Sequence, residues 1–212
     1  SEQFILVTLP KKGDFYNQSD MYLETNDSAL FFKLIKDQIS GGEECGFYYS
    51  YQINLEKIKA FTHEILPLIH KHFFGEKKNL SRKERLDFIE IFYLFISLKI
   101  IEWIRPDYFS FTCKDGVDIG AAMGAGFYTL IKLLSSDQTW SKKETKHLVW
   151  LLFGPALKVR ERLINSHTLN RMVSALSCVA IALERDQKPF IKSLESLYDF
   201  GLFQKTDLSD IP

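Results

Sequence analysis

The sequence predicts a helix-dominated α/β domain with a small central sheet. Most segments carry apolar residues at helical spacing between capping residues, whereas three short segments are aromatic or β-branched, as in strands. Apolar residues make up 46% of the chain and aromatic residues 14%, a globular composition with an aromatic interior. The 212 residues suffice for one substantial core and show no linker, so we predict a single domain, 1–212.

Three segments are predicted to supply the strands of this sheet. Residues 3–9 (QFILVTL) are β-branched and end at Pro10, and residues 46–53 (GFYYSYQI) are aromatic. Residues 108–112 (YFSFT) form a third aromatic run directly ahead of a polar loop. The sheet is expected to be small because each run is short.

The remaining regular structure is predicted to be helical. Caps and breakers place the helices at about 28–40, 54–74 with an interruption or a kink at Pro67, 81–104, 119–135, 141–165 with a break at 154–155, 169–185 and 188–198. The most apolar run, 88–101, contains Glu90 and Lys99, so it is predicted to be a buried helix rather than a membrane span.

Charge and cysteine content exclude several classes of function. Lysines and arginines balance aspartates and glutamates at 27 each, which removes the electrostatic signature of a nucleic-acid binder. Cys45, Cys113 and Cys178 are odd in number and widely spaced, so neither a disulfide framework nor a zinc site is predicted. We therefore expect no metal, no cofactor and a reducing compartment, the cytoplasm.

The functional argument rests on the loop 112–120 (TCKDGVDIG), between the third predicted strand and a predicted helix. The first backbone N–H groups of a helix lack intrahelical partners, so such a turn is suited to bind an anion. A cysteine at this place is favoured as a thiolate, the nucleophilic form of sulfur. The arrangement predicts a phosphate and an attacking sulfur sharing one site.

The pattern C-x-D-G-x-D at 113–118 resembles the signature loop of cysteine-dependent phosphatases, most closely the myotubularin and Sac-type phosphoinositide phosphatases. The resemblance implies a strand-loop-helix core in which Cys113 is the nucleophile and Asp115 or Asp118 the acid and base. It also implies that Lys114 faces inositol phosphates. The other residues expected to surround the phosphate are Gly116, Val117, Ile119 and Gly120.

The chain departs from that family at the position where the phosphatases carry arginine. Ile119 stands there, and Gly120 replaces the hydroxyl residue that follows. Arginine binds two phosphate oxygens at once, and losing one such donor costs about 10²–10³ in rate. Arg160, Arg162 and Arg171 are the nearest downstream arginines that could replace it.

Structural roles compete with the catalytic ones for the same residues. Cys113 could be a buried structural cysteine, and Asp115 and Asp118 could be turn and N-cap residues. Gly120 and Gly124 could serve close helix packing. A basic stretch from Lys71 through Arg85 is predicted to be either a solvated face or a surface for an anionic ligand; its members are Lys71, His72, Lys77, Lys78, Arg82, Lys83 and Arg85.

Three functions follow from these alternatives. The preferred prediction is a pseudophosphatase that binds a phosphorylated ligand or a protein partner without efficient hydrolysis. An active phosphoinositide or phosphoprotein phosphatase, a phosphoric monoester hydrolase with a cysteine nucleophile and an arginine from elsewhere, is the first alternative. A helical protein-interaction module without phosphatase ancestry is the second. No nucleic-acid partner and no transmembrane segment are predicted, and peripheral membrane contact stays open.

The start of the chain, Ser-Glu-Gln without an initiator methionine, predicts a piece cut from a longer protein. A eukaryote-like phosphatase loop in an otherwise unfamiliar helical chain suggests a secreted effector of an intracellular bacterium. Such a protein would act in the host cytoplasm.

Overall fold

The computed structural model describes residues 4–114, 116–135 and 139–198. The chain divides into two compact units, 1–100 and 101–212. The single domain predicted for the whole chain stays a prediction. Across the described residues, no helix combines the length and apolar character that a membrane crossing requires.

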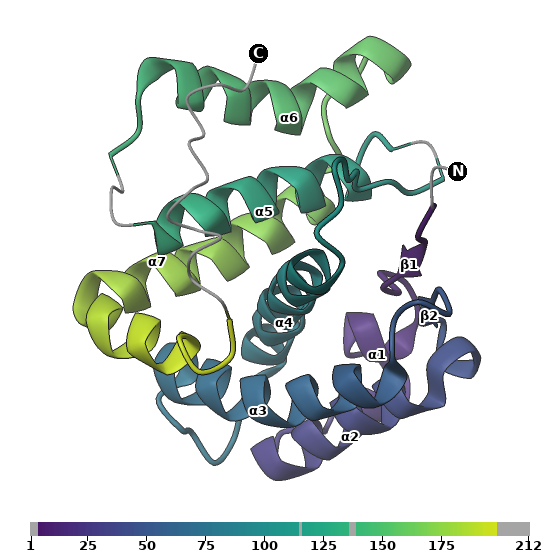
Figure 1. The fold of residues 1–212 in the computed structure, drawn as a ribbon, viewed down its shortest axis with the longest axis vertical. Coiled ribbons are helices and arrows are strands. Elements are labelled where there is room, and N and C mark those ends of the chain that lie inside the picture. The colour runs from purple at the N-terminus through teal and green to yellow at the C-terminus, as the bar shows by residue number, and fades with distance from the viewer. Residues whose placement is uncertain (1–3, 115, 136–138, 199–212) are drawn as a thin grey trace. The chain divides into compact units, whose positions relative to one another are not determined.

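The first unit is built on helices around one small sheet. Its elements are β1 (Val7–Thr8), α1 (Asp14–Asn17), α2 (Ser28–Gly41), β2 (Tyr48–Tyr49), α3 (Leu55–Phe74) and most of α4 (Arg82–Ile104), with short 3-10 turns at Asp20–Tyr22 and Gly42–Cys45. β1 and β2 are antiparallel, with Val7 opposite Tyr49 and Thr8 opposite Tyr48. Figure 1 shows this pair beside α1.

Side-chain caps start the helices of the first unit where the sequence predicts them. The Asp27 carboxylate accepts the Leu30 N–H at 2.9 Å, and Asn54 accepts the Glu56 N–H at 2.8 Å. Pro67 lies inside α3, which runs without interruption from Leu55 to Phe74, so an interruption at this proline is excluded and a kink stays a prediction.

Aromatic side chains form the core of the first unit. The Phe88 ring of α4 meets Phe31 edge-on at 5.5 Å between centroids and stacks on Phe74 at 5.2 Å. Tyr93, one turn and a half further along, meets Phe47 edge-on at 6.1 Å. Each such pair adds about 0.5–1.5 kcal/mol beyond the area it buries. The buried helix predicted from the apolar run is thereby confirmed.

The charge inside this apolar run is paired. Glu90 is buried and accepts hydrogen bonds from Lys11 and from the Tyr16 hydroxyl. The Lys11 ammonium also lies 5.7 Å from the centroid of the Tyr16 ring. A buried carboxylate is tolerated only with such partners, so Glu90 ties the segment after β1 to α4.

The basic stretch predicted as a solvated face or a ligand surface contains exposed side chains and one buried arginine. Arg85 is fully buried. Arg82 donates to the carbonyl groups of Asn17 and Gln18, both at 2.9 Å. Lys83 pairs with Asp87 within α4 at 2.8 Å. Arg82 and Arg85 thus fasten the start of α4 to residues 17–26. The lysines of the stretch are exposed, as on a solvated face.

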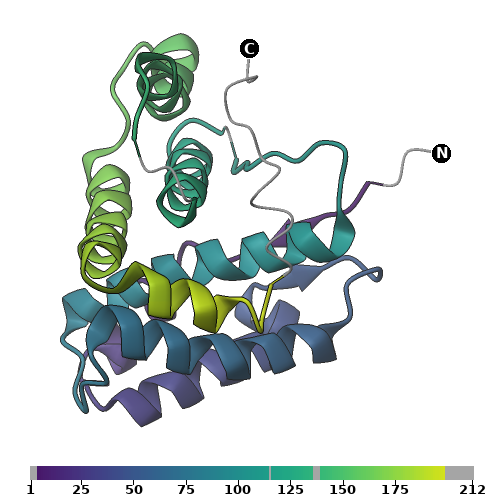
Figure 2. The ribbon, with the colours of Figure 1, turned by 60° about the vertical axis from the view of Figure 1, so that its left-hand side comes forward.

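The second unit contains three long helices and the last four residues of α4. They are α5 (Ile119–Leu134), α6 (Lys142–Arg160) and α7 (Ser166–Leu194). Figures 1 and 2 show α5 between α6 and α7, with α6 lying along its length. The core at this contact contains Ala121, Ala122, Ala125, Leu152 and Ala156. Small residues on α5 allow this close approach.

The helix boundaries of the second unit agree only in part with the prediction. Ser141 and Glu144 form the capping box that starts α6, as predicted. The predicted break at 154–155 is wrong, since α6 continues to Arg160. The two helices predicted at 169–185 and 188–198 agree with α7, in which Asp186 (φ −144°, ψ 46°) leaves the helical conformation and separates two helical parts by a kink.

The predicted α/β fold with a phosphatase-like strand-loop-helix core is wrong. Within the described residues the only sheet is the β1–β2 pair, and residues 108–112 form no strand. Instead, the rings of Phe109 and Phe111 pack on Phe127 of α5, at 5.6 and 5.2 Å between centroids. Rings two residues apart share one face of an extended segment. The aromatic residues that predicted a strand pack against a helix.

Candidate functional site

The loop 112–120 approaches α5 along the side of the helix. An ideal Cβ on Gly120 would lie 2.8 Å from the Phe111 carbonyl oxygen and 3.3 Å from the Thr112 Cα. A Cβ on Gly124 would lie 3.8 Å from the Phe111 ring, an ordinary contact. Gly120 is therefore the residue that lets the incoming backbone cross the first turn of α5.

The centre of the loop is anchored in hydrocarbon. Val117 is fully buried and belongs to the core cluster with Ala121, Leu152 and Ile164. Gly116, just before it, has φ +69°, a left-handed conformation that glycine adopts without strain. Both positions were predicted to surround a phosphate. Their geometry instead turns the chain so that the valine side chain enters the core.

Asp118 carries the strongest polar contacts of the loop. Its two carboxylate oxygens accept the two terminal nitrogens of Arg162 at 2.9 and 2.7 Å, and one of them also accepts the Asn165 N–H at 2.8 Å. The alternative N-cap role is not what the side chain does, since it makes no capping bond to α5. Asp118 joins the start of α5 to the turn between α6 and α7.

This pairing decides the protonation state of Asp118. The hydrogen bond from Arg162, together with that from the Asn165 N–H, lowers the pKa of Asp118 below its usual 3.8. A carboxyl group with a lowered pKa is ionised at neutral pH and holds no proton to donate. The predicted role of Asp118 as general acid is disfavoured by this environment.

The arginine predicted to come from elsewhere does reach the loop. It is Arg162, whose Nη1 also donates to the Leu163 carbonyl at 2.8 Å. The same fork that binds phosphate bidentately here binds a carboxylate. The 44-residue separation of Asp118 and Arg162 leaves no local signal for the pair in the sequence.

The other predicted site residues share no such network. Cys113 and Ile119 are partly buried, and Lys114 is exposed. The Thr112 hydroxyl donates to the Cys113 carbonyl at 3.1 Å. Asp115 lies outside the described residues. Within those residues, no group of three or more His, Cys, Asp or Glu side chains is placed to hold a metal ion.

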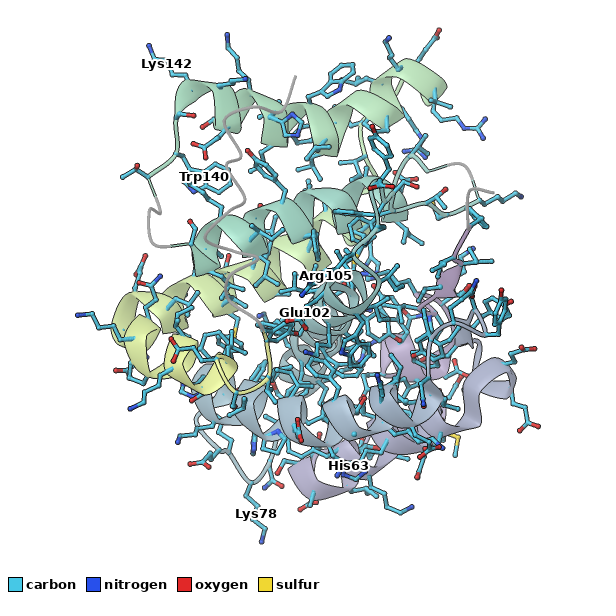
Figure 3. All side chains as sticks on the ribbon, in the orientation of Figure 1. His63, Lys78, Glu102, Arg105, Trp140 and Lys142 are labelled. Atoms are coloured by element: carbon cyan, nitrogen blue, oxygen red, sulfur yellow. The ribbon has the colours of Figure 1, made fainter. Side chains whose placement is uncertain are left out.

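The sequence did not point to a second feature, the outer face of α6. Trp150, Leu157 and Val149 are 55%, 49% and 51% exposed there. The middle of this helix, residues 147–157 (HLVWLLFGPAL), is almost entirely apolar, so the sequence alone does not show which of these residues face outward. Figure 3 shows Lys142, at the start of α6, pointing away from α5, and Trp140 below it. Trp140 packs on Tyr128 of α5.

Comparison with known proteins adds no family to this picture. No protein-family model, no curated protein and no solved structure matches the chain.

Replacing Asp118 with asparagine tests its structural role. Asp118→Asn is expected to lower the free energy of unfolding of the second unit by about 1 kcal/mol at pH 7, because a bidentate ion pair is lost. A carboxylate with a lowered folded pKa stabilises above its unfolded pKa, and this contribution is lost as pH falls through the folded value. The difference between variant and wild type should therefore shrink as the pH falls below 3.8 and through the lowered pKa of Asp118 in the folded protein.

The measurement is urea unfolding followed by tryptophan fluorescence, since Trp103, Trp140 and Trp150 all belong to the second unit. Asp107→Asn removes an exposed carboxylate of the same unit and serves as the control. A difference that persists unchanged to pH 2, or none at pH 7, contradicts the assignment.

Proposed function

We propose that this chain is a helical protein-interaction module without phosphatase chemistry. The observation that carries the proposal is the engagement of Asp118 by Arg162 and Asn165. In this contact the candidate general acid and the candidate arginine of a phosphatase site bind each other. The loop then serves to connect the start of α5 to the turn between α6 and α7.

Two further observations support the same conclusion. Residues 108–112, directly before Cys113, form no strand, so the element that presents the nucleophile in the resembling family is missing there. Val117, in the middle of the loop, is buried in the core rather than facing a ligand. An interaction role is supported by the exposed apolar residues of α6, since large exposed apolar patches mark binding surfaces.

The three cysteines bear on where such a module acts. Cys45, Cys113 and Cys178 are partly buried and form no disulfide within the described residues. Cysteines outside disulfides fit a reducing compartment, which supports the cytoplasm as the proposed location.

A turnover assay with a generic aryl phosphate tests the proposal. Wild type, Cys113→Ser and Ile119→Arg are all expected to show no hydrolysis above the buffer rate. Restoring the arginine of a true phosphatase loop should raise the rate of hydrolysis at least about 10²-fold. We expect no such increase in this chain, because Val117 at the centre of the loop is buried in the core.

Two results would overturn the proposal. Wild-type turnover that is lost in Cys113→Ser would show an active phosphatase. Turnover gained in Ile119→Arg, and abolished again by adding Cys113→Ser, would show a decayed one. Retained helical circular dichroism in each variant excludes unfolding as the reason for inactivity.

A further inference from the structure

We propose that the outer face of α6 binds an acidic amphipathic helix of a protein partner. This inference rests on the proposed interaction function and names its surface and its partner class. We call this surface the α6 face; it comprises Lys142, Lys146, Val149, Trp150, Leu157 and Lys158.

The apolar part of the α6 face follows one side of the helix. Lys146, Trp150 and Leu157 are spaced by four and seven residues, so they share the side opposite the buried Leu152. Val149 lies at its edge. Tryptophan and leucine at this spacing match the i, i+3, i+4 and i+7 contacts by which an amphipathic helix is bound.

Trp150 is held as a flat platform by the helix itself. An ideal Cβ on Gly154 would lie 2.8–3.1 Å from three atoms of the indole ring, so only glycine lets the ring rest there. Glycine inside a helix costs about 1 kcal/mol relative to alanine. The ring remains 55% exposed. A pre-positioned, exposed tryptophan is the kind of side chain that dominates binding energy at protein interfaces.

The charge of the α6 face indicates the charge that its partner should carry. Lys142, Lys146 and Lys158 are exposed, and within the described residues no ion pair engages them. Glu144 is the sole acidic residue of α6, and its carboxylate binds Lys132 of α5 at 2.8 Å. The face is therefore cationic around an apolar centre. Glutamate or aspartate side chains flanking an apolar stripe would complement it.

The placement of the lysines favours a protein over a lipid surface. The Lys158 ammonium lies 5.9 Å from the centroid of the Trp150 ring, and Lys146 is one turn before Trp150. Inserting the ring into hydrocarbon would carry these charges toward the same apolar medium, which is costly. A partner helix can instead cover the ring with leucine while its carboxylates meet the lysines.

The test uses the full chain labelled with 5-fluorotryptophan, which gives three ¹⁹F signals. The signal of Trp150 is the one that disappears in Trp150→Phe. The probe is a designed helical peptide of about 18 residues, or five turns, with leucine at one stripe and glutamate elsewhere. Matched peptides carry lysine in place of glutamate, or the same residues in scrambled order. We expect only the acidic amphipathic peptide to shift a signal, and only that of Trp150.

Variants locate the contact. Lys146→Glu combined with Lys158→Glu should weaken binding at least about tenfold, because both salt-dependent attractions become repulsions. Gly154→Ala should also weaken it by displacing the indole ring. Lys78→Glu, an exposed charge reversal in the first unit, is the matched control and should change nothing.

The inference is overturned if the acidic peptide does not shift the Trp150 signal, or if the basic or scrambled peptide binds equally. Vesicles of phosphatidylserine and phosphatidylcholine that shift this signal while the peptides do not would assign the face to a lipid surface instead. If the peptide does not bind and the protein hydrolyses no phosphate, only the α6 face is ruled out as the binding surface. If the protein shows Cys113-dependent phosphate hydrolysis, the proposed interaction function itself is ruled out.

Discussion

Arg85→Met is expected to unfold the first unit or to destabilise it by about 3 kcal/mol or more. The guanidinium is fully buried and donates five hydrogen bonds. Its acceptors are the Gln18 and Asn26 side chains and the carbonyl groups of Tyr22, Leu23 and Leu80, at 2.6–3.3 Å. Methionine fills similar volume but leaves these acceptors without donors, and each buried unsatisfied acceptor costs about 1–3 kcal/mol.

The measurement is hydrogen exchange of peptides within residues 4–100, which reports the first unit directly. Lys33→Met is the control, because the Lys33 and Asp37 side chains are 71% and 55% exposed and such a surface pair is worth under about 1 kcal/mol. An Arg85→Met protein with exchange protection equal to that of the control would show that the carbonyl groups find water instead.

Gly120→Ala is expected to destabilise the second unit by about 2 kcal/mol, even though alanine is the better helix former. The added methyl group would meet the Phe111 carbonyl at 2.8 Å and the Thr112 backbone at 3.3 Å. These are main-chain atoms that cannot rotate away, so the segment before α5 must move. Moving it also disturbs the Phe111 and Phe127 contact.

Gly124→Ala is the matched control for this prediction. Its methyl group would lie 3.8 Å from the Phe111 ring, so the substitution should be neutral or stabilise α5 by up to about 1 kcal/mol. Urea unfolding monitored by tryptophan fluorescence compares the two. Equal effects of both substitutions would contradict a close backbone crossing at Gly120 alone.

Features that depend on neighbouring residues could be predicted from the sequence. The starts of α3 and α6 follow from Asn54 and from the Ser141–Glu144 pair, because a cap needs only residues two or three positions away. The buried character of α4 follows from its apolar run. Helical content was predicted correctly for the same reason.

Features that depend on distant partners could not be predicted. Whether residues 108–112 form a strand depends on a neighbouring strand, and their rings find α5 instead. The predicted acid, Asp118, acquires its role from Arg162, 44 residues away. A six-residue resemblance carries no information on either contact. The contacts of Asp118 argue against its predicted role as general acid, whereas the predicted roles of Cys113 and Lys114 stay predictions.

The prolines and glycines of the helices show the same limit. Pro67 predicted an interruption or a kink and Pro155 a break, yet both lie inside continuous helices. A proline removes one hydrogen bond, and tertiary packing of the helix can compensate for that loss. Gly154 does not mark a helix end; a larger residue there would collide with the ring of Trp150.

Glu144 has a consequence for how α6 can move. One carboxylate accepts the Ser141 N–H at 2.8 Å, which caps the start of α6, and binds Lys132 of α5 at 2.8 Å. Each residue of an α-helix advances about 100° around the axis. Rotating α6 about its axis by one position would break the ion pair with Lys132, so the side of α6 that faces outward is fixed before any partner arrives.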